Sequence, residues 1–407
     1  MTIRRIRIIA MIVIVIGSMF ALSGLGPVGA GHTPGTTVHV DDDCDDPGDG
    51  TPGDPFCTVQ EGVAHANAGD TVSVAAGTYV EAGQIVIDKN LTLAGAGSGA
   101  TVIMTDSDTG TGGDSRGWIL VESGIVFGVA DLTLDGAGHK IWQAIRHHGA
   151  GSVDGVRFTN IAYQVSGQPY GGTGIAAFGT GPVHVSDSAF GGIGRIGLQY
   201  FGSGVSGSVA DGNTFVGKGS GDWLDYGIEV SNGAQITATN NSISGNRGVA
   251  SSDGSSSAGI LVTTFFGGGS AAVIENNDLS NNTTAIYVGF DGSDTSMVAA
   301  HQNNITGNDF GVVTTAPAVD ATCNWWGSVS GPENATSNPD GEGDSADDGV
   351  TFEPWLTGEA PGGNCNGPLL NPETKDDCKR GGWRDYGFRN QGQCIRYVNT
   401  GYDSRLE

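Results

Sequence analysis

The sequence has little positive charge: Lys and Arg together number 18, against 44 Asp and Glu, which gives a formal net charge of −26. A surface this acidic repels phosphate backbones and anionic lipid headgroups, so we expect no nucleic-acid partner. Proline is scarce at 14 residues, and beyond residue 30 the sequence has no apolar run long enough to cross a membrane. It also lacks Cys-x-x-Cys motifs and mixed Cys/His spacings, which argues against structural zinc.

The one long apolar run, residues 8–22, lies close to the N-terminus. It follows Arg4, Arg5 and Arg7 and leads into small residues that end at Ala30. This pattern predicts a signal peptide over residues 1–30, with an uncleaved membrane anchor as the alternative. We therefore expect a secreted protein, located outside the cell or in the cell envelope, with no membrane contact after cleavage.

Six cysteines follow the predicted signal peptide. Six cysteines allow fifteen pairings, and sequence alone does not select one. Proximity along the chain favours Cys44 with Cys57, Cys378 with Cys394, and by elimination Cys323 with Cys365. Disulfides in an oxidising compartment fit these cysteines better than metal ligation.

Glycine is abundant, with 71 residues, and much of it belongs to a repeat. Short apolar segments that begin with a small residue recur every 23 to 32 residues. These segments are GWIL at 117, AIRH at 144, GIAA at 174, GLQY at 197, GIEV at 227, GILV at 259, AIYV at 285 and GVVT at 311. Short strands at such a period, without helical periodicity, predict a solenoid of stacked coils.

Strand alternation assigns each position of the repeat to a face. The residue after each small residue is expected to point inward, which gives the column Trp118, Ile145, Ile175, Leu198, Ile228, Ile260, Ile286 and Val312. The next residue along is expected to point outward, which gives Ile119, Arg146, Ala176, Gln199, Glu229, Leu261, Tyr287 and Val313. The outward column is where a ligand would bind.

A second feature of the repeat is asparagine at one fixed position. Aligning the coils on Ile243, Leu279, Ile305 and Trp326 brings together Asn241, Asn277, Asn303 and Asn324, with Asn213 as a fifth member. Stacked asparagines can hydrogen-bond along the column. We also expect these asparagines themselves to adopt the left-handed turn conformation that bends the chain.

The coils, the asparagine column and the closing stretch VDATCNWWGSVSGP resemble the right-handed parallel β-helix repeat proteins of the pectin-lyase-like superfamily, in their secreted bacterial form. The resemblance covers residues 38–357 and implies an all-β fold, a right-handed parallel β-helix (solenoid). Thr58 and Glu61 form a capping box for a short N-terminal helix that would close the first coil, with Gly69 beyond its end. The chain lacks the clustered Asp motifs of polygalacturonase-like glycosidases and the Arg-plus-calcium-Asp arrangement of pectate lyases, so the resemblance implies the scaffold without a catalytic signature.

The composition changes after the β-helix. Residues 358–375 are expected to form a linker, and residues 376–407 a small C-terminal disulfide module that contains Cys378 and Cys394. The simplest role for this module is a cap or spacer. Attachment to a cell-envelope polymer is the alternative.

The first functional hypothesis is binding of a polysaccharide or cell-surface glycan by a monomeric protein. The predicted ligand-binding residues are Arg146, His148, Phe178, Gln199, Phe201 and Trp223. Aromatic rings can stack on the C–H faces of sugars, while charged and amide groups bind the hydroxyls. An ordinary solvated sheet surface is the simpler alternative.

The second hypothesis is a polysaccharide lyase or glycosidase that acts on acidic glycans around Glu229. Its candidate catalytic residues are Asp222, Asp225, Glu229 and Arg195. A glycosidase needs two carboxyl groups, whereas a lyase needs a base and a cation beside the uronate carboxylate. Lys218, Arg146 and His147 are further candidates for that cation.

Two acidic stretches, residues 41–50 and 339–349, are candidate sites for a metal ion. Asp41, Asp43 and Asp45 offer hard oxygen ligands that suit Ca²⁺. They do not follow the twelve-residue calcium-loop pattern, so a solvated acidic loop is the alternative. We expect no other metal or cofactor.

Overall fold

The computed structural model describes residues 35–44, 48–163, 171–316, 318–365, 372–384, 386, 388–402 and 404. The predicted signal peptide lies outside these residues. Three parallel sheets dominate the described chain, with strands that are adjacent in space but separated by one coil in sequence. Within this part of the chain, no helix is both long and apolar enough to span a membrane.

The first sheet has twelve strands that pair in chain order. They are β1 (Thr37–Val40), β2 (Asp70–Val74), β5 (Leu91–Ala94), β8 (Val126–Ala130), β11 (Ala150–Asp154), β14 (Val183–Ser186), β17 (Ser208–Asp211), β20 (Gln235–Thr239), β23 (Ala271–Glu275), β26 (Met297–His301), β29 (Val319–Asp320) and β30 (Val350–Thr351).

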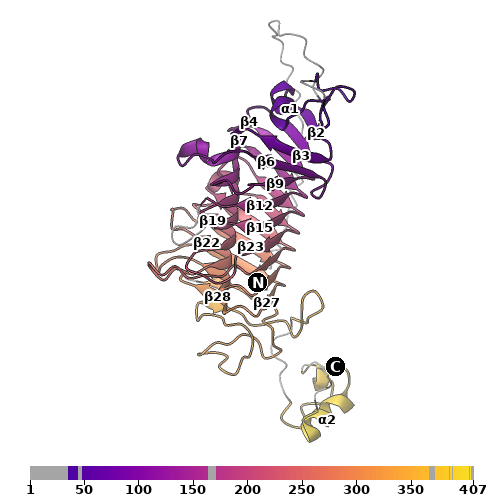
Figure 1. Cartoon of the computed structure of the whole chain (residues 1–407). Coiled ribbons are helices and arrows are strands. Elements are labelled where there is room, and N and C mark those ends of the chain that lie inside the picture. Colours follow the sequence, from indigo (N-terminus) through magenta and orange to yellow (C-terminus); the bar gives the residue numbers. More distant parts are fainter. Residues whose placement is uncertain are drawn as a thin grey trace, which may run out of the picture. The chain divides into compact units, whose positions relative to one another are not determined.

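The second and third sheets have nine strands each. The second contains β4 (Ile85–Ile87), β7 (Gly117–Val121), β10 (Gln143–His147), β13 (Thr173–Ala177), β16 (Ile196–Phe201), β19 (Tyr226–Ser231), β22 (Ala258–Thr263), β25 (Thr284–Val288) and β28 (Phe310–Thr314). The third contains β3 (Gly77–Glu81), β6 (Thr101–Thr105), β9 (Thr133–Asp135), β12 (Arg157–Ile161), β15 (Ala189–Ile193), β18 (Thr214–Val216), β21 (Ser242–Ser244), β24 (Asp278–Ser280) and β27 (Asn304–Thr306). Figure 1 shows the strands stacked coil upon coil. The predicted parallel solenoid is confirmed.

The core consists of in-register columns of apolar side chains. Ile145, Ile175, Leu198 and Ile228 pair across successive strands and have no exposed surface, as predicted. In the third sheet, the rings of Phe158, Phe190 and Phe215 stack with centroids 4.7 and 4.5 Å apart. Each such buried side chain contributes roughly 1.5–3 kcal/mol through removal from water.

The predicted register is wrong by one residue in the coil of β7. Ile119, expected to face outward, pairs with Ile145 and is fully buried in the inward column. Leu120 therefore occupies the position that pairs with Arg146. The shift has a local cause, because Trp118 is buried as well as Ile119. The apolar run of β7 is therefore compatible with two registers, and the position of Gly117 does not indicate which of them the strand adopts.

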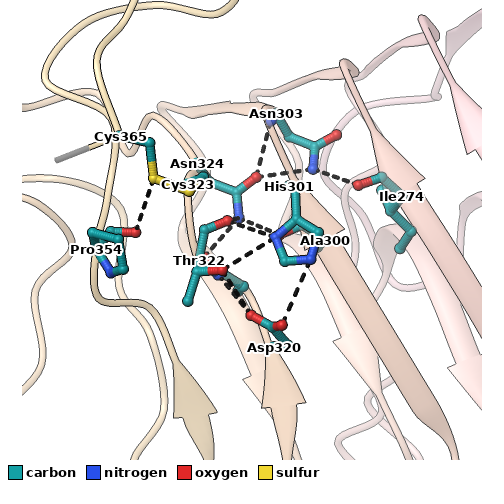
Figure 2. A network of polar contacts seen from close by, with 11 residues as sticks. Ile274, Ala300, His301, Asn303, Asp320, Thr322, Cys323, Asn324, Pro354 and Cys365 are labelled. Atoms are coloured by element: carbon teal, nitrogen blue, oxygen red, sulfur yellow. Dashed lines mark hydrogen bonds and ion pairs between the residues drawn. A yellow bond between two sulfur atoms is a disulfide. The ribbon is translucent and has the colours of Figure 1, made fainter. Parts of the chain in front are cut away.

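The asparagine column is confirmed as a continuous hydrogen-bonded ladder from Asn213 to Asn324. Each side-chain amide donates to the side-chain oxygen of the next asparagine over 2.9 Å, and every member is buried. Figure 2 shows the end of this ladder, where Asn303 also donates to the backbone oxygen of Ile274 and Asn324 to that of Ala300.

The expected backbone conformation of the ladder asparagines is wrong. The left-handed residues are those immediately before them: Asn240, Asn276, Gln302 and Cys323, with φ between 55° and 57°. The bend is thus made by an outer residue, which leaves the ladder asparagine free to turn its amide inward. A second ladder joins Asn246, Asn282 and Asn308 and ends on the carboxylate of Asp344.

The N-terminal end of the stack is covered by α1 (Val59–His65), which has the predicted capping box between Thr58 and Glu61. The helix ends at His65, before Gly69. The carboxylate of Glu81, from β3, accepts hydrogen bonds from the backbone N–H groups of Val59 and Gln60 at 2.7 and 3.0 Å. An acidic group at a helix N-terminus is electrostatically favourable.

The disulfides join Cys44 to Cys57, Cys323 to Cys365 and Cys378 to Cys394, the pairs favoured by proximity. Figure 2 shows the second of them beside the asparagine ladder. The third lies in the C-terminal segment, where Cys378, Phe388 and Cys394 form a small core together with side chains of α2 (Gln391–Thr400).

Candidate functional site

The predicted outward column lies on the outer surface of the second sheet. Arg146, Ala176, Gln199 and Glu229 occupy one register position in β10, β13, β16 and β19. Their chain neighbours Ile145, Ile175, Leu198 and Ile228 are buried inside, so strand alternation turns this column outward. We call the surface formed by Arg146, His148, Phe178, Gln199, Phe201 and Glu229 the candidate face.

One end of the candidate face is a charged cluster that is organised by Asp114. This residue comes from the short 3₁₀ helix η1 (Gly113–Arg116), and its Oδ1 lies 2.9 Å from both Arg146 Nε and His148 Nε2. Hydrogen bonds from Arg146 and His148 lower the pKa of the Asp114 carboxyl group. Sequence reasoning missed Asp114, because it lies 32 residues before Arg146 in an irregular stretch.

Arg146 is held in place by two further contacts. Its Nη1 donates to Gln143 Oε1 at 3.0 Å, and its guanidinium lies 4.8 Å from the centroid of the Phe178 ring. A cation over an aromatic face is an attractive arrangement. The guanidinium is thus fixed on the face by a carboxylate, an amide and a ring.

The middle of the face is a hydrogen-bonded chain of three residues. Gln199 Nε2 donates to Glu229 Oε1 at 2.9 Å, and Ser231 Oγ donates to the same oxygen at 3.0 Å. Glu229 is only 5% exposed, although its register position faces outward. It therefore acts as an oriented acceptor beneath the surface, while Gln199 is the more accessible partner.

Two phenylalanines, Phe178 and Phe201, form the aromatic part of the candidate face. Phe178 follows β13 and Phe201 ends β16, and their ring centroids lie 5.2 Å apart. His148 lies 6.1 Å from Phe178. Both phenylalanines are partly exposed, so the rings can contact a ligand that lies over the polar column.

Trp223 and Asp225 belong to the excursion between β18 and β19 and form a separate cluster with Lys218. Asp225 is buried; its Oδ2 accepts the backbone N–H of Lys218 at 2.7 Å and lies 3.2 Å from Lys218 Nζ. Burial raises the pKa of Asp225 to about 6 and lowers the pKa of Lys218. The lysine ammonium lies 5.7 Å from the Trp223 ring, whose Nε1 donates to backbone oxygens of Gly219 and Arg247.

The three candidate carboxylates have different partners. Asp222 is exposed and accepts hydrogen bonds from the backbone and hydroxyl of Ser251, whereas Asp225 pairs with Lys218 and Glu229 with Gln199. Arg195 is half-buried, and its positive charge favours the deprotonated forms of both Tyr226 and Lys218. A cationic side chain, Lys218, and two buried carboxyl groups, those of Asp225 and Glu229, therefore lie in β19 and the excursion before it.

His147 is not on this face, which corrects its candidacy as a surface cation. It points into the core beside Phe127, has no exposed surface, and neither ring nitrogen has a hydrogen-bond partner among the described residues. Burial lowers its pKa to about 4, so it is neutral at ordinary pH. The reason is strand alternation: Arg146 and His148 face outward, so His147 faces inward.

The acidic stretch near the N-terminus brings together Asp41, Asp42 and Asp43, with one oxygen of each within 4.8 Å of the others. Asp45 lies outside the described residues. Asp42 also accepts a hydrogen bond from the backbone N–H of Thr78, and Asp41 accepts one from that of Asp43. The oxygens suit a hard cation such as Ca²⁺, but hydrogen bonds of this kind equally order an acidic loop.

Two hollows of the described surface lie on the other sheets. One, of about 620 Å³, is lined by residues of β20, β23 and β26 in the first sheet. Another, of about 400 Å³, is lined by residues of β12, β15 and β18 in the third sheet. The candidate face lies in neither of them.

The right-handed β-helix family, described as "Right handed beta helix region", matches residues 143–324. This stretch contains all six residues of the candidate face. No curated protein sequence matches the chain significantly.

Solved structures with similarity to this chain include the Azotobacter vinelandii mannuronan C-5 epimerase AlgE6 A-module, at 18% identity and a TM-score of 0.48, over 72% of this chain and 85% of that one. Pectate lyase Pel9A aligns at 12% identity and a TM-score of 0.48, over 88% of this chain and 86% of that one. A rhamnogalacturonan lyase aligns at 12% identity and a TM-score of 0.44, over 78% and 85%. The stacked parallel sheets make the described chain a parallel β-helix, and its residues 143–324 match the right-handed β-helix family.

Proposed function

We propose that this protein binds a polysaccharide on the candidate face. The observation that carries the proposal is the in-register placement of Arg146, Gln199 and Glu229 on strands of one sheet, with the rings of Phe178 and Phe201 alongside. A sugar chain presents C–H faces and hydroxyl groups together, and such a surface offers rings for the first and fixed polar groups for the second. The open sheet surface suits a long chain better than a small, enclosed ligand.

A secreted or envelope location supports this role. The three disulfides are typical of proteins that fold in an oxidising compartment, and the N-terminal 30 residues have the pattern of a signal peptide. We place the β-helix at residues 38–357, the linker at 358–375 and the disulfide module at 376–407. A monomer that meets glycans outside the cytoplasm is consistent with these features.

Affinity electrophoresis through gels that contain soluble polysaccharides tests the binding function. The variants are Arg146→Ala and Gln199→Ala, and the matched controls are Arg157→Ala and Gln235→Ala, whose side chains are exposed on the third and first sheets. We expect retardation of the wild type by at least one polysaccharide, weaker retardation of both face variants, and no change in the controls. Equal mobility of all proteins in every gel would refute the proposal.

A second function, cleavage of an acidic glycan, is favoured by one observation: the buried Asp225 carboxyl next to Lys218, with a pKa raised to about 6. Near neutral pH such a group is a better base than an ordinary aspartate. In a lyase reaction, the base would remove the proton at C5 of a uronate whose carboxylate is neutralised by a cation. The electrons of the C5–H bond would form the C4=C5 double bond, and the glycosidic oxygen would leave C4 with its bond electrons and take up a proton from water. The candidate cations are Lys218, whose Nζ lies 3.2 Å from Asp225 Oδ2, and Arg195, whose charge acts on the ionisation of Lys218.

The catalytic alternative is tested with assays for reducing ends and for unsaturated uronates. The wild type is compared with Asp225→Asn and Glu229→Gln, each of which removes a carboxylate but keeps the shape of the side chain. Product that disappears in either variant supports cleavage at this site. Product formation that is unaffected by both changes would eliminate these residues as catalysts, and no product with any glycan would eliminate the enzyme hypothesis.

A further inference from the structure

A row of phenylalanines begins on the candidate face and continues past it along the second sheet. Its five members, here called the aromatic strip, are Phe178, Phe201, Phe266, Phe265 and Phe290. They lie at or just after the C-terminal ends of β13, β16, β22 and β25, which belong to one sheet with β19 between β16 and β22. The strip therefore crosses five neighbouring strands along the direction in which the coils stack.

The rings of the strip form a continuous series. The centroids are 5.2 Å apart from Phe178 to Phe201, 5.3 Å from Phe201 to Phe266, 5.0 Å from Phe266 to Phe265 and 5.3 Å from Phe265 to Phe290. Phe201 and Phe266 come from strands that are not adjacent, so the turn after β22 leans back across β19 to close the series.

The second half of the strip is strongly exposed. Phe265, Phe266 and Phe290 are 63%, 54% and 39% exposed. The turn that carries Phe265 and Phe266 is nevertheless fixed: the buried Asp294 accepts the backbone N–H of Thr264, and Thr263 Oγ1 accepts that of Phe265. Contiguous apolar rings on a firmly held turn mark an interaction surface more often than an incidental exposure.

We propose that the aromatic strip holds an uncharged linear polysaccharide that lies across the strands, parallel to the stacking direction of the coils. The inference rests on the proposed glycan-binding function and adds the class and orientation of the ligand. Neighbouring rings of the strip are inclined to one another by 55° to 90°, so some present a face and others an edge to a ligand. The rings that present a face can stack on sugars, whose axial C–H groups form an apolar face. Hydroxyl groups on the other edge of the chain then reach the polar column that contains Gln199.

The charges around the strip favour a neutral ligand over a polyuronate. Arg146 lies over Phe178, but its guanidinium already binds Asp114 and Gln143. At the other end, Asp291 is exposed next to Phe290. The whole chain carries a formal charge of −26. A polyanion would be repelled at the Asp291 end of the strip and by the net charge of the chain, whereas an uncharged chain would not.

The geometry also sets the length of ligand that is needed. From β13 to β25 there are four steps between neighbouring strands of about 4.8 Å each, roughly 19 Å in all, which is about the length of four sugars in an extended chain. Affinity should rise with each added sugar up to about four or five and then level off.

Affinity electrophoresis with defined polysaccharides tests the inference on the full-length protein. The neutral probes are glucomannan, xyloglucan and mixed-linkage β-glucan, and the charged probes are polygalacturonate and alginate. The strip variants are the double substitution Phe265→Ala with Phe266→Ala, and Phe290→Ala. The controls, Val216→Ala and Met297→Ala, remove exposed apolar side chains from the third and first sheets. Circular dichroism of each variant checks that the fold is retained.

We expect retardation by at least one neutral polysaccharide, a loss of affinity of about tenfold or more in both strip variants, and no change in the controls. Binding to polyuronates alone would leave the proposed function standing and overturn this inference. Binding to a neutral glycan that is the same in wild type and strip variants would also overturn it. Absence of binding to every probe would overturn both. For a neutral glycan that binds, calorimetry with its oligosaccharides of two to six sugars then checks the predicted plateau.

Discussion

The side-chain amide of Asn277 donates to the side-chain oxygen of Asn303 over 2.9 Å, and neither residue has exposed surface. Asn277 also accepts hydrogen bonds from the backbone and side chain of Asn241, and donates to the backbone oxygens of Ala238 and Glu275. One side chain thus joins three coils. It satisfies polar groups that would otherwise be buried without partners, which is expensive in free energy.

Replacement of Asn277 by Ala should lower the free energy of unfolding by about 2–4 kcal/mol, because several buried donors and acceptors lose their partner together. Urea denaturation followed by circular dichroism measures the change. The neighbouring Asn276 is a suitable control, since it is exposed and has φ of 57°, a value that glycine adopts freely. Asn276→Gly should change stability by less than about 0.5 kcal/mol. Equal effects of the two substitutions would contradict a structural role for the ladder.

The ladder also explains why so much of the fold could be predicted from the sequence. Stacked coils place the same side chain in the same environment repeatedly, so Asn241, Asn277 and Asn303 recur at one position in the sequence, each followed two residues later by a buried Ile or Leu. Asn246, Asn282 and Asn308 recur with the same regularity, three residues after those apolar positions. The second ladder could therefore have been found by the same alignment.

The remaining features depend on contacts that do not repeat. Asp114 meets Arg146 through a single irregular excursion, and Phe266 meets Phe201 only because one turn leans across β19. The register of β7 was ambiguous because both Trp118 and Ile119 are buried, so alternation gave no signal there. Periodicity in the sequence locates columns of side chains along the strands. The turns between strands do not repeat, so the contacts that turns make cannot be located in this way.

His147 is expected to make the protein sensitive to acid. Its folded pKa is about 4 and its ordinary value is 6.5, so between these values the unfolded chain binds a proton that the folded chain does not. The free energy of unfolding therefore falls as the pH drops from about 6.5 to 4, by roughly 3 kcal/mol in total from this residue. His147→Leu should remove this part of the decline, as measured by urea denaturation at several pH values.

The exposed His184 of β14 serves as the control for this measurement. His184→Leu replaces an imidazole that lies on the surface, and it should leave the acid decline of the wild type unchanged. If His147→Leu keeps the full acid decline of the wild type, protonation of His147 does not contribute to it.

Glu81 should be essential for the helix that covers the first coil. Its buried carboxylate accepts the N–H groups of Val59 and Gln60, which begin α1. Glu81→Ala leaves two N–H groups without their acceptor and should lower the free energy of unfolding by about 2–4 kcal/mol, whereas Glu81→Gln retains an oxygen acceptor and should have about half that effect. Hydrogen exchange of the two amides should accelerate in the same order. The exposed Glu122 supplies a control, since Glu122→Ala should alter neither quantity.

The buried pair of Asp225 and Lys218 leads to the last prediction, which separates its effect on stability from any role in function. Burial raises the folded pKa of Asp225 to about 6, above its ordinary value of 3.8, so between these values the folded chain binds a proton that the unfolded chain releases. From this group alone, the free energy of unfolding falls as the pH rises from about 4 to 6, by roughly 2–3 kcal/mol. Asp225→Asn should abolish that slope, while Asp88→Asn, at an exposed site, should preserve it.

At neutral pH, Asp225→Asn should leave the protein no less stable than the wild type, because the amide resembles the protonated carboxyl group that the folded chain prefers. The double substitution of Lys218→Met with Asp225→Leu removes both charges and should also be at least as stable as the wild type, as replacement of buried ion pairs by apolar side chains often is. If the double variant is also fully able to bind and process glycans, the pair is structural. If it is stable but forms no product from a glycan that the wild type cleaves, the buried pair belongs to a catalytic site.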